Sequence, residues 1–243
     1  MKVRAERGLA VASTLLGGAS LLGFGVFLWR GSFELLPLGL DGAAVLAWDA
    51  AVSAAFFIQH SGMIRSAFRR SLVRAVPLHL HAAVYSVASG IVLVAVLVLW
   101  QRSSVPVWSV DPPWSLAFRA WFVAAILGFV LGIRALRGFD GFGLRPIRDR
   151  LRGRTRPSGA LAVSGPYRWV RHPLYTGVLV MIWSCPAVTL DRLLFNLLWT
   201  GWMVVGTLLE ERDLVREFGD DYRTYRAAVP MLIPWTLRPR WPV

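Results

Sequence analysis

The chain has 243 residues, a formal net charge of +13, and 56% hydrophobic residues that include twelve tryptophans. Soluble domains are less apolar, and the apolar residues here form uninterrupted blocks of membrane-spanning length. This composition excludes an ordinary soluble domain and predicts an all-α polytopic bundle of membrane helices. The single cysteine, Cys185, excludes an intramolecular disulfide and a cysteine metal cluster.

Six apolar segments are candidate membrane spans. The first follows basic residues, as a signal peptide would, but it stays apolar for more than twenty residues and is interpreted as a retained anchor. The fifth is short, and it is expected to form a tight hairpin with the sixth through residues 190–192; five spans are the alternative. The six segments are 8–29, 41–59, 80–100, 116–136, 174–189 and 193–209.

Basic residues are distributed unevenly between the two sides of the predicted bundle. Six spans place both termini and the connections 60–79 and 137–173 on one side, and that side holds all but four of the lysines and arginines. This positive-inside pattern predicts both termini in the cytoplasm of a bacterial inner membrane, with the active surface facing the cytoplasm. It also explains the net charge through topology and anionic lipids, without nucleic acid and without an obligate protein partner. The exceptions are Arg30, Arg102, Arg119 and Arg192.

Residues 165–177, Gly-Pro-Tyr-Arg-Trp-Val-Arg-His-Pro-Leu-Tyr-Thr-Gly, are the most informative stretch of the chain. Proline suits the first turn of a helix, so Pro173 is predicted to begin a membrane helix with Arg171 and His172 beside its start. The N-terminus of a helix presents unpaired N–H groups and the positive end of the helix dipole, which attract anions. The motif therefore predicts that a carboxylate or phosphate is held there.

A second cluster follows the last span and begins with Glu210 and Glu211. Steps of three and four place Glu211, Val215, Phe218, Tyr222, Tyr225 and Val229 on one helix face. Gly219 and Asp220 predict a helix stop and a new N-cap, hence two short helices. Carboxylates at the end of a span need partners, and Arg168 and Arg171 are available. A salt-bridged corner and a binding site for a zwitterionic ligand both remain open.

His60 ends the second span within Gln59-His60-Ser61. A lone histidine in this place is usually a solvated end residue. Ligation of haem by His60 and His172 is an alternative, which would make the chain a non-enzymatic haem-binding membrane protein. The sequence contains no Walker loop, no metal-ligand spacing and no nucleophile elbow, so no metal site is predicted.

The motif at 165–177, together with Glu210-Glu211-Arg212 and Phe218-Gly219-Asp220-Asp221-Tyr222-Arg223-Thr224-Tyr225, resembles the isoprenylcysteine carboxyl methyltransferase superfamily, over about residues 139–234. Three further motifs look like those of bacterial methanethiol S-methyltransferases. They are Gln59-His60-Ser61-x-Met63-x-Arg65, Phe139-Asp140-x-Phe142-Gly143-Leu144-Arg145 and Val229-Pro230-Met231-Leu232-Ile233-Pro234. The resemblance implies N-terminal spans for anchoring and acceptor binding over 1–138, and a methyltransferase core over 139–243.

The resemblance further implies that S-adenosylmethionine binds in a cytoplasmic pocket between the last spans and the C-terminal cap. Arg171, His172 and the helix start at Pro173 suit the carboxylate of this cofactor. Glu210 or Glu211 suits its amine or ribose hydroxyls. The remaining members of the expected cofactor-binding set are Tyr175, Tyr222 and Tyr225 as walls for the adenine, Gly177 for close approach, and Tyr167 and Arg168.

A small thiol is the favoured methyl acceptor, and a prenylcysteine carboxylate or a phospholipid amine is the alternative. Methyl transfer from a sulfonium depends on alignment and on an available nucleophile. A free cysteine thiol has a pKa near 8.5, so a basic pocket raises the thiolate fraction at neutral pH. Arg65, Arg145 and Arg168 are the candidates for the positive charges of that basic pocket. His60 is the candidate general base.

Overall fold

The computed structural model describes residues 2–136, 138–154, 161, 163–236 and 238–241. Among these residues, five helices are long and apolar enough to cross a membrane, which confirms the all-α polytopic fold. The helices are α1 (Lys2–Arg30), α2 (Gly42–Ile64), α3 (Ser66–Leu72), α4 (His81–Leu99), α5 (Trp114–Ala135), α6 (Leu144–Leu151), α7 (Pro173–Trp183) and α8 (Leu190–Ala228), with 3-10 turns η1 (Leu78–Leu80) and η2 (Gly165–Arg168) and strands β1 (Pro106–Ser109) and β2 (Ala187–Thr189).

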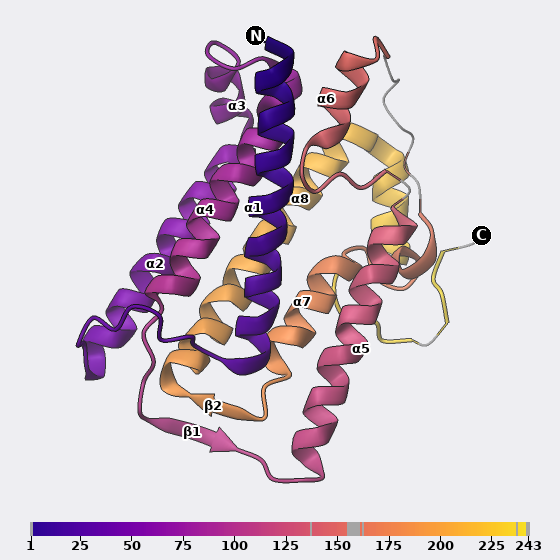
Figure 1. The fold of residues 1–243 in the computed structure, drawn as a ribbon. Coiled ribbons are helices and arrows are strands. Elements are labelled where there is room, and N and C mark those ends of the chain that lie inside the picture. The colour runs from indigo at the N-terminus through magenta and orange to yellow at the C-terminus, as the bar shows by residue number, and fades with distance from the viewer. Residues whose placement is uncertain (1, 137, 155–160, 162, 237, 242–243) are drawn as a thin grey trace. The chain divides into compact units, whose positions relative to one another are not determined.

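The chain forms two compact units. The first comprises 1–106, 140–157 and 189–195, and the second comprises 107–139, 158–188 and 196–243. In the first unit α4 packs against both α1 and α2, and in the second α5 packs against α7 (Figure 1). The expected domain boundary between residues 138 and 139 stays a prediction.

Residues 190–192 form the first turn of α8, so the predicted hairpin turn at this place is wrong. Arg192 is 3% exposed and its guanidinium donates to the Phe27 and Leu28 carbonyls, each at 3.0 Å. These carbonyls lie in the last turn of α1, where helix geometry leaves them without partners and the dipole favours a cation. The neighbouring Asp191 accepts from Trp100 Nε1 at 3.1 Å. Both charges therefore hold the first turn of α8, which belongs to the first unit, in place within that unit.

The fifth predicted span is only partly helical. The eleven residues of α7 rise about 16 Å, roughly half of a hydrocarbon core. The chain then leaves the helix, and Ser184 and Cys185 are buried. The Ser184 hydroxyl donates to the Val180 carbonyl at 2.6 Å and Cys185 Sγ to the Ala187 carbonyl at 2.9 Å. Non-helical backbone is tolerated at membrane depth where protein covers it. The six-span count stays a prediction.

The break expected at Gly219 is confirmed. α8 contains a kink there, with φ 59° and ψ −128°, a conformation that glycine adopts without a steric penalty. The residues before the kink, 210–218, continue the membrane helix rather than forming a separate short helix as expected. Glu210 and Glu211 therefore lie on the same continuous helix as the last apolar segment.

The Phe139–Arg145 motif builds the start of α6. The Asp140 carboxylate accepts the backbone N–H groups of Leu144 at 2.9 Å and Arg145 at 2.7 Å, which otherwise have no partner inside the helix. Gly143 has a φ of 69°, and a Cβ there would lie 2.3 Å from the backbone nitrogen of Ala83 on α4. The motif thus positions Arg145 through backbone geometry and close packing.

We expect Gly143→Ala to lower the free energy of unfolding by about 2–5 kcal/mol. The left-handed backbone costs a residue with a Cβ about 1–2 kcal/mol, and the overpacking costs about 1–3 kcal/mol more. Gly153→Ala is the matched control, because Gly153 has a φ of 61° with nothing within 4 Å of its Cβ position. Unfolding of both variants in detergent measures the difference, and equal losses would contradict the close approach to Ala83.

Candidate functional site

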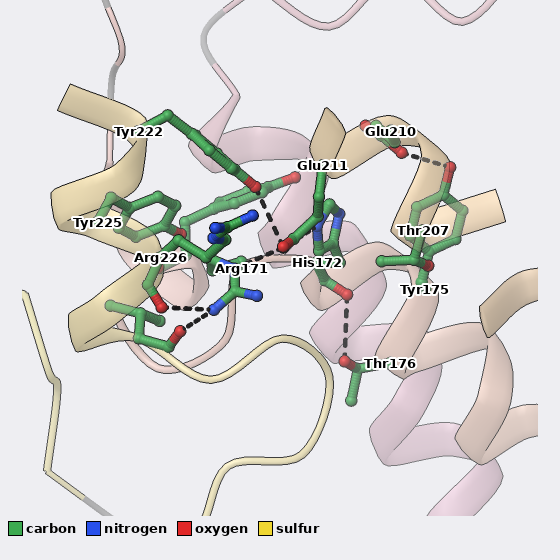
Figure 2. Close-up of polar contacts among 12 residues, drawn as sticks. Arg171, His172, Tyr175, Thr176, Thr207, Glu210, Glu211, Tyr222, Tyr225 and Arg226 are labelled. Carbon is green, nitrogen blue, oxygen red and sulfur yellow. Dashed lines mark hydrogen bonds and ion pairs between the residues drawn. The ribbon is translucent and has the colours of Figure 1, made fainter. Parts of the chain in front are cut away.

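The site in the second unit is centred on the Glu211 carboxylate. Arg171 Nε donates to Glu211 Oε1 at 2.6 Å, and His172 Nε2 lies 3.1 Å from the same oxygen. The Tyr222 hydroxyl also donates to it, at 3.2 Å. Figure 2 shows these three side chains converging on Glu211. The Arg171 and Glu211 side chains are only 8% and 7% exposed, so the pair is shielded from solvent. A buried charge of this kind needs such partners to be tolerated.

The same residues fasten the chain that follows α8. Arg171 Nη1 donates to the Arg226 carbonyl at 2.9 Å and to the Val229 carbonyl. The Arg171 backbone N–H donates to the Pro230 carbonyl at 2.8 Å. Arg171 therefore connects the start of α7, the Glu211 carboxylate on α8 and the backbone at the end of α8. This arrangement is the salt-bridged corner, formed with Arg171 and His172 rather than with Arg168.

Glu210 has a different environment. Its carboxylate is half-buried and accepts the Tyr175 hydroxyl at 2.8 Å, apart from the contacts of Glu211 (Figure 2). Burial, together with the negative charge of Glu210, raises the pKa of Tyr167 above its ordinary value. Tyr167 therefore stays a neutral phenol at any physiological pH. Glu210 combines negative charge with partial exposure, which suits contact with a cationic or hydroxyl-bearing ligand.

Tyr222 and Tyr225 belong to a packed aromatic core. They are 2% and 3% exposed, and their ring centroids lie 5.8 Å apart in an edge-on arrangement. The Tyr225 hydroxyl donates to the Tyr167 carbonyl at 2.6 Å. Val229 completes the buried cluster, so the helix face expected from the residue spacing is confirmed. Contact of these rings with an adenine stays a prediction.

The other expected cofactor residues, Arg168, Pro173 and Gly177, each have contacts of their own in the second unit. Arg168 Nε donates to the Trp241 carbonyl at 2.7 Å. Pro173 begins α7 as expected, with His172 at its N-cap. Gly177 faces α5, where a Cβ would lie 3.4 Å from the Ala125 carbonyl oxygen and from Phe129 Cβ. Its small size serves helix packing at that contact.

The three expected catalytic residues all lie in the first unit. His60 is near the end of α2, and its Nε2 lies 2.7 Å from the Tyr85 hydroxyl on α4. Arg65 is the C-cap of α2, and Arg145 is in the first turn of α6. Both arginines are half-buried. Their roles toward an acceptor stay predictions.

Sequence reasoning missed two residues at these sites. Thr176 donates its hydroxyl to the Leu232 carbonyl at 2.7 Å and so holds the C-terminal segment against α7. Tyr85 was missed although it lies four residues after His81 and four before Ser89. Polar residues at helical spacing inside an apolar span were the available signal.

The fold and the site define a helical membrane protein whose last long helix carries a buried, charge-paired carboxylate just after its apolar segment. Comparison with known proteins identifies the family: the chain belongs to the NnrU protein family, whose model it matches over residues 50–230. No solved structure matches it significantly.

Curated relatives include two proteins named methanethiol S-methyltransferase. The one from Pseudomonas sp. (strain GM41(2012)) is 36% identical over 211 residues, covering 82% of this chain and 79% of the relative. The one from Mycobacterium tuberculosis (strain ATCC 25618 / H37Rv) is 33% identical over 189 residues, covering 75% of each chain. Nurim from Rattus norvegicus is 26% identical over 187 residues, covering 70% of this chain and 68% of that protein. The resemblance seen in the motifs is confirmed.

We expect Glu211→Ala to lower the free energy of unfolding by about 3–5 kcal/mol, because it leaves the Arg171 guanidinium buried without its counter-charge. The double variant with Arg171→Ala should lose less than the sum of the single losses. Asp213→Ala is the control, since the Arg216–Asp213 pair on the same helix has side chains 78% and 57% exposed and should contribute about 0–1 kcal/mol. Similar losses for both pairs would show that the corner is solvated.

Proposed function

We propose that this protein is an integral-membrane methyltransferase that uses S-adenosylmethionine to methylate a small thiol such as methanethiol. The names of relatives 30–36% identical to this chain support the reaction. The observation in the structure that carries the proposal is the pair of neighbouring carboxylates on α8, one enclosed by Arg171 and His172 and the other half-exposed beside Tyr175. In the proposed orientation both termini and this site face the cytoplasm of a bacterial inner membrane.

The chemistry of the residues fits the cofactor. When bound, S-adenosylmethionine supplies a methyl group on a positively charged sulfur. Its amino-acid end carries both charge signs, and its ribose carries two hydroxyls. Glu210 suits the ammonium or a ribose hydroxyl, because its carboxylate is half-buried and accepts the Tyr175 hydroxyl with only one of its oxygens, Oε2. The first turn of α7, which begins at Pro173, has N–H groups without intrahelical partners and suits the carboxylate.

The geometry also refines the roles in the expected set. Because Arg171, His172 and Tyr222 all contact Glu211, we assign them chiefly to holding the start of α7 in place. Tyr167, Tyr175 and Glu210 then form the face that meets the cofactor. Contacts with parts of the cofactor far from the methyl group supply binding energy, and this energy aligns the methyl donor with its acceptor.

The acceptor side is proposed to lie in the first unit, with His60, Arg65 and Arg145. A basic environment raises the thiolate fraction of a small thiol. A lipid acceptor, either a prenylcysteine carboxylate or a phospholipid amine, is the alternative within the same reaction class.

Transfer of a labelled methyl group from S-adenosylmethionine to methanethiol, a prenylcysteine and phosphatidylethanolamine tests the proposal directly. We expect purified protein in detergent to label methanethiol in preference to the other two. Labelling of a lipid acceptor alone would replace the proposed substrate. Absence of transfer together with a Soret band in the visible spectrum would instead favour the non-enzymatic haem-binding alternative.

We expect Glu210→Gln to weaken S-adenosylmethionine binding by about 1.5–3 kcal/mol, the contribution of a hydrogen bond to a charged group. Glu217→Gln, two helical turns further along the exposed face of α8, removes the same charge and is the matched control. Calorimetric titration of the three proteins measures the difference. Equal affinities would remove Glu210 from the cofactor site.

A further inference from the structure

Polar residues line the face of α4 that meets α2. His81, Tyr85 and Ser89 are spaced by four residues and so lie on one helix face. Tyr85 contacts His60 Nε2 at 2.7 Å, and Ser89 Oγ lies 3.4 Å from Gln59 Nε2. Polar side chains between membrane helices are costly and mark functional positions.

A cavity of about 840 Å³ opens at the end of this polar face within the first unit. Pockets of this size hold small-molecule ligands. Tyr85 lines the cavity, whereas His60 contacts Tyr85 from α2. Other residues of its wall include Met63, His79, His81, Pro146 and Arg150.

Two residues near His60 and Tyr85 in the sequence each carry a buried polar atom that the described structure leaves without a partner: Gln59 directly before His60, and His81 one helical turn before Tyr85. Within the part of the chain that the structure describes, Gln59 Oε1 and His81 Nδ1 are buried without a hydrogen-bond partner. His81 is 7% exposed, and its Nε2 lies 2.9 Å from the Val76 carbonyl. Since a carbonyl only accepts, Nε2 carries the proton, and Nδ1 of the neutral ring is an acceptor.

A purely structural role explains these features incompletely. Hydrogen bonds between membrane helices do help to hold them together, but buried polar groups in such a role are normally satisfied. Here Tyr85, whose hydroxyl contacts His60, lines the cavity together with His81, whose Nδ1 has no partner among the described residues. A ligand that donates a hydrogen bond, such as a thiol or its accompanying water, fits this arrangement.

We propose that this cavity, which Met63, Tyr85 and Arg150 help to line, is the site of the thiol acceptor. Tyr85 contacts the thiol, and His60 is a positioning residue that acts through Tyr85. This inference rests on the proposed methyltransferase function and moves His60 one residue away from direct contact. The thiol proton passes to Tyr85 Oη as the tyrosine proton passes to His60 Nε2. The thiolate lone pair forms a bond to the methyl carbon of the donor. The bond between that methyl carbon and the donor's sulfonium sulfur breaks, and its electrons stay on the donor's sulfur. His60 then returns its proton to water, and the hydroxyl of Tyr85 is neutral throughout.

Kinetics with thiols of graded acidity test the relay. General acid–base assistance contributes about 10²–10⁴-fold, so we expect Tyr85→Phe to lower kcat/KM for methanethiol by roughly that factor. The loss should shrink for an acidic thiol such as thiophenol, which is already ionised at neutral pH. His60→Gln should show the same dependence on thiol acidity. Thr14→Val is the control, because Thr14 is exposed on α1 and its hydroxyl donates to the Ala10 carbonyl of the same helix.

A second measurement does not depend on turnover. Nitrogen-15 NMR of histidine-labelled protein, with His60→Gln to assign the signal, reports the tautomer and hydrogen bonding of His60. We expect the His60 ring signals to change in Tyr85→Phe while calorimetric affinity for S-adenosylmethionine is retained. Retained affinity also shows that the variant is folded.

The outcomes separate this inference from the proposed function. If the unmodified protein methylates no thiol, the proposed function fails first. If it does methylate thiols and Tyr85→Phe is equally active on all of them, the acceptor site is elsewhere. A loss of the same size for acidic and weakly acidic thiols, with unchanged His60 signals, would reduce Tyr85 to a packing residue.

Discussion

The site in the second unit depends on one carboxylate oxygen, Glu211 Oε1, and the donors gathered around it. A buried anion at the end of a membrane helix is unstable alone, and Arg171 in particular supplies the compensating charge at 2.6 Å. Arg171 also binds carbonyls at the end of the cap. Arg171 therefore joins the start of α7, the Glu211 carboxylate on α8 and the Arg226 and Val229 carbonyls at the end of α8. In the proposed function, the neighbouring Glu210 on the same helix is the carboxylate that meets the cofactor.

Buried polar groups elsewhere in the molecule differ in how completely they are satisfied. Asp191 in the first unit accepts from Trp100 Nε1, the Ser103 backbone N–H and the Thr189 hydroxyl. Arg192 donates to the carbonyls of the last turn of α1, and these contacts hold the start of α8. Gln59 and His81 in the same unit each have a buried atom without a partner in the described structure. The first pattern is that of a structural fastening. The second is that expected where a substrate completes the hydrogen bonds.

Sequence reasoning identified the residues of the charged corner better than their partners. The 165–177 motif and the Glu210–Glu211 pair were expected to meet, and they do. Arg168 was expected to be available to a carboxylate, but as the last residue of η2 its Nε donates to the Trp241 carbonyl. Gly177 was expected to allow close approach, and in the structure its small size does so toward α5; its contact with a cofactor stays a prediction. Which side of a short helix meets a ligand depends on what packs against the other side.

The sequence by itself determined the membrane fold, the start of α7 at Pro173, the break at Gly219 and the face that carries Tyr222, Tyr225 and Val229. These features follow from hydropathy, from backbone restrictions and from helical periodicity, which are local properties. Tertiary structure alone decided that 190–192 begins a helix fastened by Arg192, that His172 joins Arg171 on Glu211, and that Tyr85 contacts His60. Such contacts join residues between 25 and 165 positions apart, and no local pattern specifies which donors and acceptors meet when the helices pack.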